Sequence, residues 1–321
     1  MLLKETKILI IGAGLAGLTC ARALSERGLS SVIYEKSRGV GGRLATRRSN
    51  ADVSFDHGGQ YVTAQGDKFQ AYLDEAIKSG FAAEWLPNLE EELKFPKKKI
   101  VGLSGMSDLV RPLCRELDIR FNVTVTGVSR QKEGWLIRTD KSHKEEIFDK
   151  VILTIPAPQA KELIYHETSI ISVLDKVSLL PCLAAMVAFS EKLNLSSDVF
   201  RDGSEVLAWC ARDSSKPQRN KNYDSWVLHG TPRWSKDWLE AERDIIAEKL
   251  LENFRQTYHN PLPEIKILRG HKWRYALADK MLGKEFLASD DNTLFLGGDW
   301  CMGPRAEYAY NSGRAIAAAV I

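Results

Sequence analysis

The chain has 321 residues and a formal net charge of +3; 44% of the residues are hydrophobic and 27% are charged. These proportions are those of an ordinary globular protein, and a charge so near balance excludes a dominant nucleic-acid-binding surface. No apolar run has the length that a membrane-spanning helix needs. We therefore expect neither nucleic acid nor a membrane as a partner, and we leave open whether the protein is a monomer or a homodimer.

The cysteines and histidines show no metal-binding pattern. The sequence has no CxxC pair and no HExxH motif, and its five cysteines are scattered along the chain. This usage is typical of a reducing compartment. We expect a cytoplasmic protein without a metal site.

The strongest motif lies near the beginning, between Lys7 and Glu35. An apolar run, Ile8–Ile11, precedes Gly12-x-Gly14-x-x-Gly17, and a small-residue helical pattern follows from Leu15 to about Arg27. A second apolar run, Ser31–Tyr34, ends at Glu35. This order of strand, tight turn, helix and strand is the context in which the glycine fingerprint indicates a dinucleotide site.

Each residue type in this motif has a mechanical role. Gly12 permits the turn, Gly14 lets a pyrophosphate approach the backbone, and Gly17 lets the helix pack against the strand. The helix N-terminus then favours the phosphates. A carboxylate at Glu35 can accept hydrogen bonds from ribose hydroxyls and would repel a 2′-phosphate, so we expect an NAD-like or FAD-like ligand.

Two further glycine pairs follow. The first, Gly41-Gly42, precedes Arg43, whose forked guanidinium suits a phosphate. The second, Gly58-Gly59, permits close approach of the backbone to a flat or charged group, which Gln60 and Tyr61 would face. The basic run Lys97-Lys98-Lys99 is most simply a solvated loop, and a contact with an anionic ligand stays open.

These motifs, taken in order, resemble the opening of the flavin-containing amine oxidase superfamily, and within it the bacterial renalase-like oxidases. The resemblance implies non-covalent FAD, with the first glycines and Glu35 at the ADP half, Arg43 at the phosphates, and the turn from Gly59 to Tyr61 against the isoalloxazine ring. The resemblance implies these cofactor-binding residues: Gly12, Ala13, Gly14, Leu15, Ala16, Gly17, Glu35, Lys36, Gly42, Arg43, Leu44, Gly58, Gly59, Gln60, Tyr61, Met106, Val125, Gly298, Asp299, Arg305 and Ala306.

The middle of the chain predicts further elements. Apolar spacing predicts a helix over 68–79. Alternation over 120–128 and 134–139 is typical of a sheet built from hairpins, and 151–155 reads as a buried strand. We expect an α/β fold with a discontinuous FAD-binding domain of Rossmann type (βαβ, glutathione-reductase-like), formed by 1–70, 100–160 and 270–321.

A substrate domain is expected from 71–99 and 161–269, with a mixed, mostly antiparallel sheet and flanking helices. Strands are predicted at 184–190, 206–211 and 225–230, and one helix at 233–256. Five of the eight tryptophans fall between 209 and 273, which indicates a thick core or an aromatic cavity wall. Polar loops follow two of the strands, at 211–217 and 229–232, where a rigid scaffold presents contacts.

The end of the chain returns to the nucleotide domain. Leu294–Leu296 reads as a strand, Gly297-Gly298-Asp299 ends it, and a small-residue helix is predicted over 305–321. By the resemblance, Asp299 would lie near the ribityl chain and the helix N-terminus would point at the flavin, where its dipole favours the reduced, anionic form. Cys301 could in principle carry a covalent flavin link, which the family pattern does not suggest.

Three functions remain open. The resemblance favours an FAD-dependent oxidase that returns isomeric dihydronicotinamide forms of NAD(P)H to NAD(P)+ while O2 becomes H2O2. Another amine oxidase or desaturase, acting on a small amine or an apolar substrate, is the second hypothesis, and a non-catalytic flavin-binding protein is the third. No lysine can be assigned beside flavin N5, which weakens the amine-oxidase hypothesis. We expect the cavity lining to include Tyr61, His229, Trp273 and Arg274, and substrate phosphates to meet Arg212, Lys216 or Arg274.

Overall fold

The computed structural model describes residues 6–49, 53–89, 97–141, 146–201, 204–258 and 261–320. The chain forms two compact units, each assembled from separate stretches of sequence. Unit 1 comprises Met1–Gly42, Val110–Leu179 and Ala278–Ile321, and unit 2 comprises Arg43–Leu109 and Leu180–Leu277.

The compact units and the predicted domains have different boundaries. Residues 43–70, 100–109 and 270–277, which we assigned to the FAD-binding domain, lie in unit 2, and 161–179 lie in unit 1. A division by compactness does not decide which residues serve the cofactor. The functional division therefore stays a prediction.

Unit 1 is built on a six-stranded sheet in the order β17-β18-β11-β1-β2-β7. Five strands are parallel and β17 is an antiparallel edge. The strands are β1 (Ile8–Ile11), β2 (Ser31–Glu35), β7 (Asp118–Phe121), β11 (Lys150–Leu153), β17 (Phe286–Ala288) and β18 (Leu294–Gly297).

The first strand occupies the centre of this sheet, which explains its unbroken apolar sequence. A parallel strand covered on both faces has no side chain to expose. Leu9 and Ile11 point into a core shared with Val128 and Trp135. Ile8 and Ile10 alternate with them and therefore face the opposite side of the sheet.

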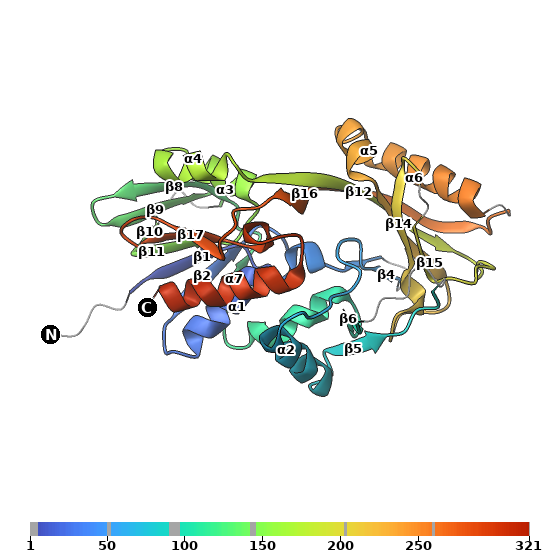
Figure 1. The fold of residues 1–321 in the computed structure, drawn as a ribbon, viewed down its shortest axis with the longest axis horizontal. Coiled ribbons are helices and arrows are strands. Elements are labelled where there is room, and N and C mark those ends of the chain that lie inside the picture. Colours follow the sequence, from blue (N-terminus) through green and yellow to red (C-terminus); the bar gives the residue numbers. More distant parts are fainter. Residues whose placement is uncertain are drawn as a thin grey trace. The chain divides into compact units, whose positions relative to one another are not determined.

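Two helices, α1 (Leu15–Ser25) and α7 (Ala306–Ala319), lie side by side in unit 1 (Figure 1). Their small residues permit this close contact. A methyl group on Gly313 would stand 2.3 Å from the carbonyl oxygen of Ala16. The small-residue pattern predicted at both ends of the chain thus serves one helix–helix contact.

A three-stranded antiparallel sheet, β10-β9-β8, packs over the core of unit 1 together with two short helices. The prediction of a single strand over 120–128 was wrong. The chain turns at Asn122, which has a φ of 55°, so 118–121 joins the parallel sheet and only the later residues pair with β9. The elements are β8 (Val125–Gln131), β9 (Gly134–Thr139), β10 (Glu146–Phe148), α3 (Ala157–Leu163) and α4 (Thr168–Leu174).

Unit 2 contains a five-stranded sheet in the order β13-β14-β15-β12-β16. Trp226 and Leu228 of β15 point to one face, into a core with helix α6 (Arg243–Tyr258). Val227 points to the other face and packs with Val53 and Phe55. The strands are β12 (Ser178–Phe189), β13 (Val199–Phe200), β14 (Leu207–Arg212), β15 (Asp224–Gly230) and β16 (Ile265–Lys280).

The single helix predicted over 233–256 is two helices, α5 (Pro232–Asp237) and α6 (Arg243–Tyr258). Trp234, Trp238 and Leu239 all pack against the same core. One straight helix would turn Leu239 away from Trp234, because neighbouring positions differ by about 100° around a helix. The break after residue 237 lets all three side chains pack against this core, each partly buried.

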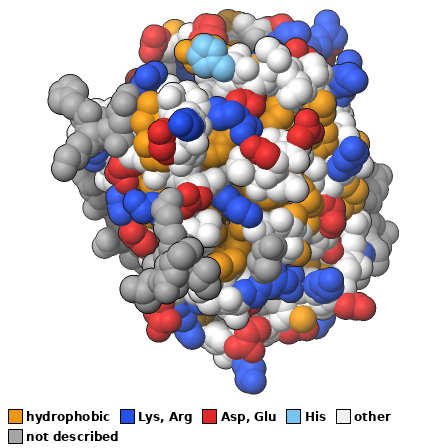
Figure 2. Space-filling model, turned by 90° about the vertical axis from the view of Figure 1, so that its left-hand side faces the viewer, with side chains coloured by type: hydrophobic (Ala, Val, Ile, Leu, Met, Phe, Trp, Pro, Cys, Tyr) orange, Lys and Arg blue, Asp and Glu red, His pale blue; other side chains and the backbone are white. Residues whose placement is uncertain are grey.

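Unit 2 also contains short strand pairs and one amphipathic α-helix. They are α2 (Asp67–Lys78), β3 (Arg47–Arg48), β4 (Ser54–Phe55), β5 (Ala82–Trp85) and β6 (Lys99–Gly102). None of the described helices is long and apolar enough to cross a bilayer. On the face drawn in Figure 2, basic and acidic side chains are interspersed among the coloured atoms, without a broad patch of one sign.

Candidate functional site

The first glycine loop in unit 1 has the geometry that a dinucleotide needs. Gly12 has a φ of 104°, and a methyl group on Gly17 would stand 2.1 Å from the carbonyl oxygen of Gly12. These two glycines are therefore required by the fold itself. Gly14 differs, because a methyl group there would meet nothing within 4 Å. The open space beside Gly14 is a cradle that a Cβ would fill.

The N-terminus of α1 opens onto this cradle without a protein cap. Its N-cap residue is Gly14, no side chain caps it, and its first turn holds no acidic residue. The first N–H groups of a helix have no intrahelical acceptors, and together with the helix dipole they favour an anion. The donor set therefore fits a diphosphate.

The second glycine pair lies beside the first loop. The amide of Gly41 donates to the carbonyl of Ala13 at 2.9 Å, and Gly42 adopts a φ of 55°. A methyl group on Gly42 would approach the Cα of Gly14 to 3.4 Å. The structure thus brings together the two glycine loops that the sequence identified separately.

Glu35 ends β2 beside these loops and is only 7% exposed. One carboxylate oxygen accepts from the amide of Ala13 at 2.8 Å, and the other accepts from the amide of Ser37 at 2.7 Å. A carboxylate offers about four acceptor positions, so two remain for ribose hydroxyls. Lys36 beside it is exposed.

The C-terminal motif of unit 1 is equally constrained. Gly298 has a φ of 151°, and its amide donates to Ser312 Oγ at 2.9 Å. Asp299 is 6% exposed and begins a short 3-10 helix that leads to Arg305, the N-cap of α7, and Ala306. The side chain of Val125 packs in the core, so only its backbone could contact a nucleotide.

Unit 2 holds the other predicted cofactor residues around one turn, residues 56–61. The amide of Gly59 donates to the carbonyl of Arg43 at 2.9 Å, and a methyl group on Gly58 would stand 2.2 Å from the same oxygen. On Gly59 it would stand 3.0 Å from the Leu44 side chain and 3.8 Å from the Arg43 carbonyl oxygen. Met106 is fully buried, and its amide donates to Asp56 Oδ1 at 2.8 Å.

Four side chains, His57, His229, His271 and Trp273, form what we term the imidazole–indole group. The carbonyl of His57 accepts from Trp273 Nε1 at 2.8 Å and lies 3.2 Å from His229 Nε2. The His57 ring centroid lies 4.6 Å from that of His271 and 4.9 Å from that of Trp273. The group is therefore tied to the turn through one backbone carbonyl.

The three imidazoles of this group are uncharged at neutral pH. Burial lowers the pKa of His57 and of His229 to about 4 each. Burial, and then the neighbouring His57, lower the pKa of His271 to about 3. The group can stack and donate hydrogen bonds at neutral pH, and it offers no fixed charge to a substrate.

The structure brings together three of the four residues expected to line the cavity. Tyr61 contacts Trp209 at 6.1 Å between ring centroids, and Trp209 is the cross-strand partner of His229. Arg274 does not join them. It alternates with Trp273 along β16 and forms an exposed ion pair with Glu240 at 2.6 Å. Arg274 therefore lies exposed on β16, an edge strand of its sheet.

The expectation that Arg212 and Lys216 meet substrate phosphates was wrong. Arg212 is 3% exposed and Lys216 is not exposed at all. Arg212 pairs with Asp198 at 2.9 Å, and Lys216 pairs with Asp213 at 2.7 Å. The polar loop after β14 folds inward, because each cation in it has a buried carboxylate partner.

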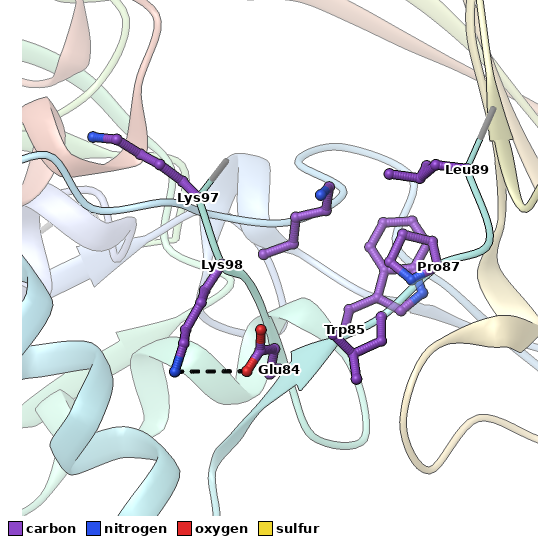
Figure 3. A pocket seen from close by; sticks show the side chains of 8 residues that line it. Glu84, Trp85, Pro87, Leu89, Lys97 and Lys98 are labelled. Atoms are coloured by element: carbon purple, nitrogen blue, oxygen red, sulfur yellow. Dashed lines mark ion pairs between the residues drawn. The ribbon is translucent and has the colours of Figure 1, made fainter. Parts of the chain in front are cut away.

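The three consecutive lysines line a pocket of about 240 Å³ with Glu84, Trp85 and Pro87 (Figure 3). Lys98 forms an ion pair with Glu84 at 3.8 Å, and Lys97 donates to the carbonyl of Ala64 at 3.0 Å. These cations already have protein partners. Within the described ranges, no cluster of three or more His, Cys, Asp or Glu residues could hold a metal ion.

Sequence reasoning missed the buried ion cluster that contacts the 56–61 turn. Asp56, Asp213, Lys216 and Arg219 form it, and all four are at least nine-tenths buried. The available signal was charged residues directly after apolar strands, in FDHGG and in ARDSSKPQR. Such residues ordinarily mark solvated loops, so the pattern alone favoured the wrong environment.

Comparison with known proteins is consistent with a nucleotide site at the open space beside Gly14 in unit 1. The family "NAD(P)-binding Rossmann-like domain" matches residues 10–76, and the family "Flavin containing amine oxidoreductase" matches residues 81–321. Lysine-specific histone demethylase 1 homolog 3 of Arabidopsis thaliana is 46% identical over 59 residues, which is 18% of this chain and 4% of that protein.

A second relative covers more of the chain. Flavin-containing monooxygenase FMO GS-OX2 of Arabidopsis thaliana is 22% identical over 288 residues, or 85% of this chain and 62% of that protein. The chain thus spans less than two thirds of the length of either curated relative. Their activities and substrates are not transferred from these matches.

Solved structures show the same fold. A putative protoporphyrinogen oxidase from Exiguobacterium sp. 255-15 superposes with a TM-score of 0.76 at 14% identity, covering 98% of each chain. A putrescine oxidase double mutant gives a TM-score of 0.73 at 13% identity, covering 98% of this chain and 99% of that one. With the family match over most of its length, the chain belongs to the flavin-containing amine oxidoreductase family, an oxidoreductase family whose cofactor is a flavin.

Proposed function

We propose that the protein binds FAD without a covalent link and oxidises isomeric dihydronicotinamide forms of NAD(P)H. A hydride leaves the dihydropyridine ring, the oxidised product is NAD(P)+, and O2 with one proton becomes H2O2. The bound flavin supplies the hydride acceptor and the reaction with oxygen. The protein supplies orientation, exclusion of water and electrostatic tuning.

The single observation that carries this proposal is the uncharged state of the imidazole–indole group. A dihydropyridine loses a hydride without losing a proton, so its oxidation needs no general base. Histidines whose pKa values are lowered to about 4 and about 3 suit such a substrate. An amine substrate is cationic at neutral pH and gains most from a carboxylate or a strong base.

The residues then have distinct roles in the proposal. The uncapped α1 N-terminus and Glu35 hold the diphosphate and ribose of FAD, and the 56–61 turn contacts the flavin ring. Tyr61, His229 and Trp273 present aromatic surface to the nicotinamide. If His229 donates through Nε2 to the His57 carbonyl, its Nδ1 is unprotonated and can accept a hydrogen bond from the substrate amide.

Burial supports the non-covalent part of the proposal. Cys301 is fully buried, and burial raises the pKa of its thiol to about 12. A thiol forms a covalent bond as its thiolate, which is scarce at neutral pH for such a group. A cytoplasmic location, and a monomer or homodimer, remain predictions.

The second candidate is an amine oxidase, which the family match and the putrescine oxidase fold favour. One experiment separates the two. The purified protein is mixed anaerobically with borohydride-reduced NAD+, which contains the dihydronicotinamide isomers, and separately with putrescine and with benzylamine. The absorbance of oxidised flavin is followed by stopped flow.

We expect the dihydronicotinamide mixture to bleach the flavin at least tenfold faster than either amine. Admission of oxygen should restore the colour and release one H2O2 per flavin. Faster bleaching by an amine would establish the second candidate in its place. A yellow protein that no donor bleaches would identify a non-catalytic flavin protein.

A further inference from the structure

The buried ion cluster of unit 2 has no role in the function proposed so far. Asp56 Oδ2 accepts from Arg219 Nη2 at 2.6 Å and from Lys216 Nζ at 3.1 Å. Lys216 Nζ also donates to Asp213 Oδ1 at 2.7 Å and to Gln60 Oε1 at 3.2 Å. Its three N–H donors thus have three acceptors, and none of them reaches solvent.

Stability alone does not account for this arrangement. Moving two carboxylates and two cations out of water costs free energy that their mutual attraction only partly offsets. Apolar side chains of the same volume often fill such a site with equal or greater stability. A second role, in which the cluster holds a neighbouring segment of the chain in position, therefore has to be considered.

What the cluster positions is the turn that carries Gly58 and Gly59. Asp56 begins the turn, and its other oxygen accepts from Thr46 Oγ1 and from the Met106 amide, each at 2.8 Å. The Gln60 side chain connects the end of the turn to its start, because its Nε2 donates to the carbonyls of Asp56 and Gly58. Lys216 contacts both Asp56 and Gln60, so one ammonium fixes the two ends of the turn.

Arg219 connects the buried ion cluster to the end of strand β6. Its Nη1 donates to the carbonyl of Leu103 at 2.7 Å, and its Nη2 donates to the carbonyl of Gly102 at 3.2 Å. Burial raises the pKa of the Asp56 carboxyl, but Lys216 and Arg219 outweigh it, so the net pKa lies below its usual range. Asp56 is therefore a permanently charged acceptor at the start of the turn.

We propose that Lys216 and Arg219 are positioning residues of the flavin reaction, which hold the 56–61 turn in one conformation from its buried side. This inference rests on the proposed function, because it takes the turn as the part of unit 2 that contacts the flavin. Neither cation touches the substrate. They act through Asp56 and Gln60, whose turn presents Gly58, Gly59 and Tyr61.

The test compares two double variants of equal charge change. Lys216→Met with Asp213→Asn removes one buried cation and one buried anion below the turn and leaves the Asp56–Arg219 pair intact. Arg212→Met with Asp198→Asn removes the same charges from a neighbouring buried ion pair, whose other partners are Asp224, Leu193 and Asn88. The second variant is the matched control.

The first measurement needs no flavin. Hydrogen–deuterium exchange is followed in the flavin-free proteins over peptides covering 56–62 and the helix α6. We expect exchange of the 56–62 amides at least tenfold faster in the Lys216→Met, Asp213→Asn protein, with α6 unchanged. The control should exchange these amides at the wild-type rate.

The second measurement uses the flavin-loaded proteins and borohydride-reduced NAD+ as the donor. We expect the limiting rate of flavin reduction to fall at least tenfold in the Lys216 variant, with less than a threefold change in the half-saturating concentration. The visible circular dichroism of the flavin should change with it. A merely structural role would lower the melting temperature and leave both signals unchanged.

A third variant covers the case in which the double variant does not fold. Gln60→Met removes the link between the ends of the turn and leaves all four charges paired, so it should show the same exchange and rate effects. Wild-type exchange and wild-type reduction in the turn variants, with FAD bound, would overturn this inference alone. A wild-type chain that takes up no FAD would overturn the proposed function instead.

Discussion

The contrast between Gly14 and Gly17 gives the sharpest prediction, because both belong to one motif and only one is required by the fold. A methyl group on Gly17 would stand 2.1 Å from the Gly12 carbonyl oxygen and 2.5 Å from Thr154 Oγ1. A Cβ essentially never approaches a backbone atom within 3.0 Å, so the helix or the loop must shift. On Gly14 the same group meets nothing within 4 Å.

These geometries give different free energies of unfolding for the flavin-free protein. Overpacking costs about 1–3 kcal/mol, and a clash between backbone atoms belongs at the upper end. The free energy of unfolding of Gly17→Ala should therefore be about 3 kcal/mol below that of wild type, which is roughly a 100-fold change in the folded-to-unfolded ratio. Gly14→Val should lose about 1 kcal/mol or less, the cost of a poorer N-cap.

Added FAD should reverse the order of stability of the two variants, so that Gly17→Ala becomes the more stable one. A ligand at 100 times its dissociation constant stabilises the folded state by about 2.7 kcal/mol. Wild type and any folded Gly17→Ala protein should gain this stabilisation. Gly14→Val should gain none, because its side chain fills the space that the pyrophosphate needs.

The assay is urea unfolding of each protein with and without saturating FAD, read by far-ultraviolet circular dichroism. Flavin content after gel filtration provides a second readout, and for Gly14→Val it should fall below one tenth of the wild-type value. A Gly14→Val protein that remains yellow and gains stability from FAD would refute the placement of the cofactor. Equal losses of flavin-free stability in both variants would refute the packing argument.

Two further predictions concern unit 2. Gly58→Ala should lose flavin content and reduction rate at least tenfold, because its methyl group would stand 2.2 Å from the carbonyl oxygen of Arg43. A wild-type flavin content in this variant would contradict the packing argument. The three histidines of the imidazole–indole group have folded pKa values of about 4, 4 and 3, lowered from the ordinary 6.5 chiefly by loss of solvent. The unfolded chain therefore binds more protons than the folded chain between pH 4 and 6.5, and the free energy of unfolding falls as the pH drops through that window. His271→Phe should reduce the slope of the unfolding free energy against pH by about 1.4 kcal/mol per pH unit between pH 5 and 6. Urea titrations at several pH values measure this slope. An unchanged slope would show that His271 is already protonated in the folded state.

The sequence predicted unit 1 well because its signals are local. The strand Ile8–Ile11, the glycine loop and the helix that begins at Leu15 lie within about twenty residues, and each residue type there has a steric reason. The structure confirms these elements and the α/β fold class. The strand at 118–121 was assigned to the wrong sheet, because alternation of apolar residues does not reveal a turn at Asn122.

The candidate site in unit 2 was predictable only in part. Motif order pointed to Tyr61, His229 and Trp273, but the environment of a charged side chain depends on partners that are distant in sequence. Lys216 is buried because Asp56, 160 positions away, accepts from it. No pattern local to ARDSSKP could have distinguished that environment from a solvated loop, and Arg274 was misplaced for the same reason.

The discontinuous assembly of unit 1 has a consequence for how the protein matures on the ribosome. Unit 2 is complete once Leu277 has been synthesised, whereas unit 1 still lacks β18 and α7. Until those segments emerge, β11 has no partner on one side and α1 lacks the helix that contacts it through Gly313. Non-local contacts of this kind form slowly. We therefore expect the cofactor to be loaded late in biogenesis, after α7 has packed against α1.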